Sequence, residues 1–109
     1  MSLDETAFAR IADQTLENFM DAIDGVLGDQ ADVDLEGGIL TIELDAGGEY
    51  VINKHAPNRQ IWMSSPKSGA THFEYDDEAA KWCCTRSGGK LDEMLASELK
   101  TLTGVTVTL

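Results

Sequence analysis

Four carboxylates repeat along one side of a predicted N-terminal helix. They occupy positions i, i+4, i+8 and i+11, as Asp13, Glu17, Asp21 and Asp24. At about 100° per residue, these positions span an arc of roughly 80° beside the apolar face of the helix. Like charges four residues apart cost about 0.2–0.5 kcal/mol per pair, and no lysine is interleaved with them. The pattern favours a surface that binds a cation or a basic partner.

The next predicted strand extends the acidic pattern. Asp32, Asp34 and Glu36 alternate with Val33 and Leu35, so helix and strand side by side would line one edge with carboxylates. Sites made only of carboxylates suit hard or borderline cations such as Ca²⁺, Mn²⁺, Fe²⁺ and Fe³⁺. Residues 1–52 contain neither His nor Cys, so we expect weak, exchangeable metal binding. A solvated acidic face and a surface read by a basic protein remain compatible with the same pattern.

A tryptophan marks a second candidate site. In the stretch QIWMS, strand alternation that turns Ile61 and Met63 inward turns Gln60, Trp62 and Ser64 outward. Tryptophan on a polar sheet face suits an anchor for a binding partner.

The cysteines and histidines give little support to catalysis. Cys83 and Cys84 are adjacent, so in a strand they point to opposite faces and match neither a zinc spacing nor a C-x-x-C redox motif. No spacing links them to His55 or His72, which we expect to be surface residues and not ligands. We expect free thiols and no enzymatic nucleophile.

Two amphipathic segments predict helices at the ends of the chain. Residues 4–27 carry apolar side chains with a 3.6-residue period, namely Phe8, Ile11, Ala12, Leu16, Phe19, Met20, Ile23 and Leu27. A second helix begins near Leu91 and is closed by Gly104.

Six short alternating segments lie between the helices, at residues 31–36, 39–44, 49–54, 59–64, 71–75 and 81–85. The pairs Gly37-Gly38 and Gly47-Gly48 supply the positive φ angles of tight hairpins. This order predicts one α+β domain over residues 1–109, a two-layer sandwich with two helices on one face of an antiparallel sheet. The inward positions are Val33, Leu35, Leu40, Ile42, Leu44, Tyr50, Ile52, Ile61, Met63, Phe73, Tyr75 and Trp82. The outward positions are Thr41, Glu43, Asn53, His55, Gln60, Trp62, His72 and Glu74.

Charge excludes one class of partner. The chain has 8 basic and 20 acidic residues, a net charge of −12, and residues 1–52 hold a single base, Arg10. Nucleic acid is therefore an unsuitable partner. No apolar run reaches membrane-spanning length, and the start lacks the character of a signal or transit peptide, so we expect an intracellular protein without a membrane partner.

The segment YVINKHAPNRQIWMSSPKSG, residues 50–69, closely resembles the central strands of frataxins, particularly the mitochondrial type. The likeness extends to RIADQTLENFMDAID in the first helix, DVDLEGGILTIEL in the first hairpin and LDEMLASELKTLTG in the second helix. The resemblance implies a helix–sheet–helix sandwich that binds iron weakly and engages the cysteine desulfurase and scaffold of iron–sulfur cluster assembly.

The resemblance also assigns residues. It implies that iron lies on an acidic ridge, which we define as Asp13, Glu17, Asp21, Asp24, Asp32 and Asp34. It implies that a partner binds a partner face, which we define as Asn53, Asn58, Gln60, Trp62 and His72. Mitochondrial frataxins carry an arginine where this chain has His72, so contacts that need a permanent positive charge are not expected here.

The leading hypothesis is an iron-binding, non-enzymatic regulator of a desulfurase, monomeric and cytoplasmic in a bacterium. Alternatives are an iron-oxidising or iron-storage protein that oligomerises with iron, a generic acidic module for cations or basic proteins, and a location in the mitochondrial matrix after loss of a presequence.

Overall fold

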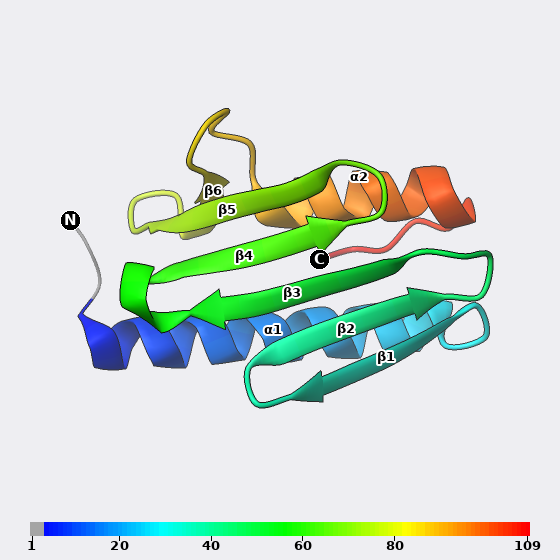
Figure 1. Ribbon diagram of the computed structural model, residues 1–109, viewed down its shortest axis with the longest axis horizontal. Helices are drawn as coiled ribbons and strands as arrows, with labels where there is room; N and C mark the ends of the chain where they lie inside the picture. Colours follow the sequence, from blue (N-terminus) through cyan, green and yellow to red (C-terminus); the bar gives the residue numbers. More distant parts are fainter. Residues whose placement is uncertain (1–3) are drawn as a thin grey trace.

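The protein, described here by a computed structural model over residues 4–109, is a helix–sheet–helix sandwich. Its six strands form a single antiparallel sheet in chain order, β1 to β6, as a simple meander (Figure 1). The elements are α1 (Glu5–Leu27), β1 (Ala31–Glu36), β2 (Ile39–Leu44), β3 (Glu49–His55), the 3₁₀ turn η1 (Ala56–Asn58), β4 (Gln60–Ser65), β5 (Gly69–Asp76), β6 (Lys81–Cys84) and α2 (Leu91–Thr103).

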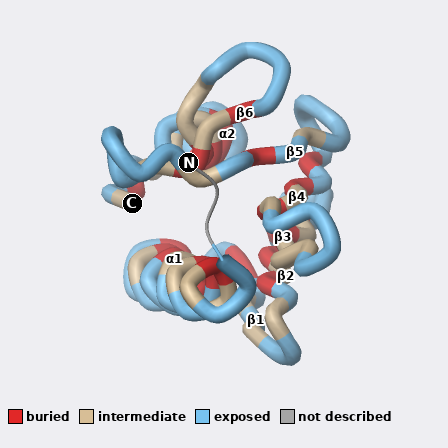
Figure 2. The backbone as a smooth tube through the Cα atoms, turned by 90° about the vertical axis from the view of Figure 1, so that its left-hand side faces the viewer, coloured by how far each residue is buried: buried red, intermediate tan, exposed pale blue. Residues whose placement is uncertain are grey.

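Both helices cover the same face of the sheet and leave the other face open (Figure 2). α1 packs on β1, β2 and β3, and α2 packs on β6. This arrangement confirms the predicted α+β two-layer sandwich. No helix among residues 4–109 is long and apolar enough to cross a membrane.

Local signals explain where α1 forms and which side it buries. Asp4 caps its start, with the carboxylate accepting a hydrogen bond from the Ala7 backbone N–H at 2.7 Å. Its buried side chains recur every three or four residues and fill the space above the sheet. These residues are Phe8, Ala12, Leu16, Phe19, Ile23 and Leu27.

Nine of the inward positions predicted for the strands are buried, which confirms their orientation. Val33 and Leu35 are only half-buried, because β1 is an edge strand whose cover comes from α1 alone. Tyr75 is also half-buried, next to the turn of the β5–β6 hairpin. All three still pack against the core.

Four of the six predicted strands differ from the structure by one or two residues at an end, and the start of β4 differs for a clear local reason. Arg59 was expected to begin a strand, but it adopts a left-handed conformation, with φ of 50°, and β4 begins at Gln60. The cause is η1, a turn containing Pro57, which Arg59 closes by donating its backbone N–H to the Ala56 carbonyl at 3.1 Å.

A buried carboxylate joins α2 to the sheet. Glu98 is 8% exposed, and its Oε1 accepts hydrogen bonds from the hydroxyls of Tyr50 and Ser65. Its Oε2 accepts a third hydrogen bond from the Ser68 hydroxyl at 2.7 Å. Burial, reinforced by the bond to Glu98, raises the pKa of the Tyr50 hydroxyl above its usual value.

The chain after α2 returns between the two helices (Figure 1). Gly104 ends α2 with φ of 76°, and its N–H donates to the Lys100 carbonyl at 2.8 Å, as the sequence predicted for a helix-closing glycine. Val107 is then buried in the core. The C-terminal segment therefore contributes to the packing between the helices.

Candidate functional site

The open face of the sheet carries a row of polar and aromatic side chains across its middle strands. The antiparallel register places Asn53 of β3 opposite Trp62 of β4, and Trp62 opposite His72 of β5. Ile61 and Met63, on either side of Trp62 in the chain, are fully buried beneath the helices. Trp62 therefore points away from the core, as the strand alternation predicted.

Trp62 is held between two histidines. Its ring is stacked on His55, with ring centroids 3.7 Å apart and planes 9° from parallel. On its other face the ring is stacked on His72, with centroids 4.2 Å apart and planes 10° from parallel. The indole side chain is half-buried as a result. Stacking on both faces restricts the ring to one orientation and leaves its outer edge available to a partner.

Hydrogen bonds fix the same side chain from a third direction. The indole Nε1–H donates to Gln60 Oε1 at 2.7 Å, and Gln60 Nε2 in turn donates to Glu74 Oε2 at 3.1 Å. The tryptophan is thus positioned by the two residues that flank it on β3 and β5 and by a neighbour on its own strand.

His55 is a participant that the sequence analysis missed. We expected a plain surface residue, whereas its ring covers Trp62, and its Nδ1 is buried without a hydrogen-bond partner among the described residues. The contact follows from the strand register, in which His55 pairs with Gln60 across the hairpin and becomes a diagonal neighbour of Trp62. The pattern of the sequence alone did not give this register.

Asn58 lies apart from the rest of the partner face. It is exposed in η1, beyond the end of β3, and not on a strand. The other four residues of the partner face lie on β3, β4 and β5 on the open side of the sheet. Asn58 would therefore contact only a partner that extends past the β3–β4 hairpin.

The acidic ridge runs along α1 and β1, which pack against each other. All six of its carboxylates are exposed. Among residues 4–109, no group of three or more His, Cys, Asp or Glu side chains is close enough to hold one metal ion. The donor chemistry suits iron, but the geometry provides separate carboxylates and no preformed chelate.

A lysine from the sheet compensates one end of the acidic ridge. Lys54 Nζ lies 2.8 Å from Asp13 Oδ1, and both side chains remain partly exposed. The sequence shows no lysine on the helix itself, and the compensating charge comes from the sheet. Lys54 occurs at the end of β3 on its helix-facing side, so only the packing of α1 on β3 brings the two together.

The cysteines are free thiols, as expected. They pair with residues on opposite faces of β5, Cys83 with the outward Glu74 and Cys84 with the inward Phe73. Hydrogen bonding from the Ser87 hydroxyl, the largest effect, lowers the pKa of the Cys84 thiol. Cys84 is nevertheless buried, which limits its access to reagents.

Sequence comparison finds relatives over most of the chain. Residues 1–105 match a family described as the frataxin-like domain. Mitochondrial frataxin of Arabidopsis thaliana is 41% identical over 94% of this chain, which spans only 57% of that protein. The iron-sulfur cluster assembly protein CyaY of Pseudomonas syringae is 40% identical over 88% of this chain and 86% of its own length.

Solved structures show the same architecture. Frataxin from Psychromonas ingrahamii matches with a TM-score of 0.86 at 25% identity, covering 97% of both chains. A trimeric frataxin from Saccharomyces cerevisiae, complexed with ferrous iron, matches with a TM-score of 0.78 at 35% identity, covering 87% of both chains.

Proposed function

Because this chain belongs to the frataxin-like family, we propose that it is a non-enzymatic, iron-binding accessory protein of iron–sulfur cluster assembly. It binds a cysteine desulfurase–scaffold complex through the partner face and regulates it. It holds iron weakly on the acidic ridge. The name of the Pseudomonas relative, an iron-sulfur cluster assembly protein, supports the pathway.

The proposal rests mainly on one observation: Trp62 is stacked between His55 and His72 on the open face of the sheet. Tryptophan is strongly enriched among the residues that dominate binding energy at interfaces. His55 and His72 already restrict the ring, so a partner that contacts its edge loses little conformational entropy on binding. Asn53 and Gln60 flank it with amide groups that can fix the partner's orientation.

The iron role rests on the chemistry of the acidic ridge. Exposed, separate carboxylates bind hard and borderline cations weakly and release them readily. The yeast frataxin structure solved with ferrous iron supports the choice of metal. The acidic ridge lies along α1 and β1, whereas the partner face occupies β3 to β5, so one chain could use both surfaces together.

The decisive experiment is a pull-down from the native lysate with and without Fe²⁺. We expect the chain to recover a cysteine desulfurase, and Trp62→Ala to lose it. Thr41→Ala is the matched control, because Thr41 lies on the same open face two strands away and is also half-buried. If the Trp62→Ala and Thr41→Ala variants recover the desulfurase equally, the partner face is wrongly assigned.

Iron oxidation and storage is the second candidate, favoured by the trimeric state of the ferrous yeast structure. An oligomer that forms with Fe²⁺ and consumes O₂, without recovery of a desulfurase, would support this function. We propose a cytoplasmic location if the source is bacterial and the mitochondrial matrix otherwise, since relatives of both kinds match at similar identity.

A further inference from the structure

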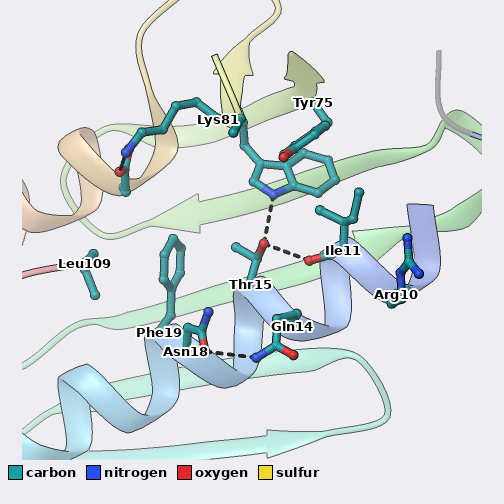
Figure 3. A pocket seen from close by; sticks show the side chains of 12 residues that line it. Arg10, Ile11, Gln14, Thr15, Asn18, Phe19, Tyr75, Lys81 and Leu109 are labelled. Atoms are coloured by element: carbon teal, nitrogen blue, oxygen red, sulfur yellow. Dashed lines mark hydrogen bonds and ion pairs between the residues drawn. The ribbon is translucent and has the colours of Figure 1, made fainter. Parts of the chain in front are cut away.

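A cavity of about 500 Å³ opens on the helix-covered side of the sheet, away from the partner face. α1 forms one wall, and the end of the β5–β6 hairpin and the start of α2 form the others (Figure 3). Three aromatic residues belong to its lining. Tyr75 and Trp82 pack edge-to-face with ring centroids 5.2 Å apart, and Phe19 lies on α1. Its volume falls in the range of about 300–1,000 Å³ that is typical of small-molecule sites.

The polar groups inside the cavity are already paired with one another. The Trp82 Nε1–H donates to Thr15 Oγ1 at 3.0 Å, and the Thr15 hydroxyl donates to the Ile11 carbonyl at 2.8 Å (Figure 3). With these bonds made, the indole N–H needs no partner from an occupant, and the ring, which is 4% exposed, contributes a small apolar area to the floor. The floor therefore suits a flat apolar or aromatic group.

The side chains that line the cavity carry a net positive charge, whereas the whole chain is strongly negative. The one side-chain carboxylate among the described lining residues, Asp92, is ion-paired with Lys81. Arg10 has no ion pair with any other described residue and is the only base in residues 1–52. None of the six residues that α1 contributes to the wall is acidic. The lining thus includes one guanidinium without a side-chain ion-pair partner, in a chain of net charge −12.

We propose that this cavity binds a small aromatic carboxylate. The ring of the ligand lies against the half-buried Tyr75 and the small exposed part of Trp82. The carboxylate pairs with Arg10, whose planar fork matches its two oxygens. A neutral aromatic would leave Arg10 unused, and a cation would be repelled by it. The carboxylates of α1 that belong to the acidic ridge are outside the lining. Asp13, three residues from Arg10, is ion-paired with Lys54, and the more distant carboxylates are screened over about 8 Å at physiological ionic strength.

The probe is 2-naphthoate, with the uncharged 2-naphthamide as its isostere, titrated into the ¹⁵N-labelled full chain. The two tryptophans report separately, because Trp82 lines the cavity and Trp62 lies on the open face. We expect 2-naphthoate to shift the Trp82 indole N–H signal and leave that of Trp62 in place. The acid should bind about fivefold more tightly than the amide, the upper range for an exposed ion pair.

Arg10→Gln tests the proposed ion pair directly. Because Arg10 is exposed, the variant should fold normally, weaken 2-naphthoate about fivefold and leave 2-naphthamide unchanged. Arg86→Gln, which removes an exposed arginine outside the cavity lining, should change neither affinity. A shift at Trp62 instead of Trp82, equal binding of acid and amide, unchanged affinity in Arg10→Gln, or no binding of 2-naphthoate at millimolar concentration each overturns the proposal. None of these outcomes bears on the partner face.

Discussion

The hydroxyl of Tyr50, in the middle of the sheet, donates a 2.8 Å hydrogen bond to the carboxylate of Glu98 on α2. Both residues are buried, and Ser65 and Ser68 complete the coordination of the carboxylate by hydroxyl donors. A buried carboxylate is tolerated when such donors surround it and is costly when they are removed. This contact secures α2 against β3 and the β4–β5 turn.

Tyr50→Phe should therefore lower the free energy of unfolding by about 1–3 kcal/mol, because Glu98 loses a donor that water cannot replace. Urea unfolding followed by circular dichroism measures this change. Tyr75→Phe is the matched control, since the Tyr75 hydroxyl makes no hydrogen bond to another described residue and the side chain is only half-buried. Equal losses in the two variants would contradict a specific role for the buried contact.

Stability should also fall at alkaline pH. The pKa of Tyr50 is raised in the folded protein, mainly by burial and next by the bond to Glu98, so the folded state retains its proton where the unfolded state begins to lose it. The stabilisation is complete below the unfolded pKa of about 10 and decreases as pH rises above it. Urea midpoints from pH 8 upward should show this decline.

Tyr50→Phe should flatten that alkaline decline without abolishing it. The hydrogen bond to Asp92 is the main reason why the pKa of Lys81 is also raised in the folded protein. Lys81 therefore also lowers the stability as the pH rises. An unchanged slope in Tyr50→Phe would show that Tyr50 does not account for the alkaline sensitivity.

Glu17→Lys should stabilise the protein modestly, by about 0.3–0.5 kcal/mol, because it replaces repulsion with attraction along α1. The gain comes mainly from Asp21, since Asp13 is already paired with Lys54. Iron binding should weaken in the same variant. Thermal melts and an Fe²⁺ titration measure the two effects, and a loss of stability would instead indicate a structural role for Glu17.

Paramagnetic Fe²⁺ should broaden NMR signals along the acidic ridge and spare the partner face. The effect should decrease with added salt, because exposed charges are screened over about 8 Å at 0.15 M ionic strength. Asp21 and Asp24 should respond more strongly than Asp13, whose carboxylate is occupied by Lys54. Broadening centred on His55, His72 or the cysteines would contradict this placement of the metal.

Trp62→Ala should separate binding from folding. The indole stacks on two histidines but fills no part of the core, so we expect a stability loss of about 1 kcal/mol. Affinity for the desulfurase–scaffold complex should fall by about 2 kcal/mol or more. Melting temperature and partner affinity are measured on the same protein. Retained affinity, or global unfolding, would show that Trp62 is not an interface anchor.

The sequence by itself determined the elements of the fold and their orientation. The period of apolar residues defined both helices, and strand alternation placed Ile61 and Met63 inward and Trp62 outward. These features follow from the fixed geometry of helix and strand, which depends on residues only a few positions apart. The chemistry of the acidic ridge was equally visible, because its carboxylates repeat along one helix.

Only the tertiary structure decided which distant side chains meet. Lys54 reaches Asp13 across 41 residues of sequence, and Glu98 accepts its hydrogen bond from Tyr50 across 48. His55 covers Trp62 because the β3–β4 hairpin sets their register. Periodicity within one element carries no information about such pairs, since they depend on how helices pack on the sheet and how strands align. The same packing creates the cavity beside Arg10. No local pattern in the sequence predicts this cavity.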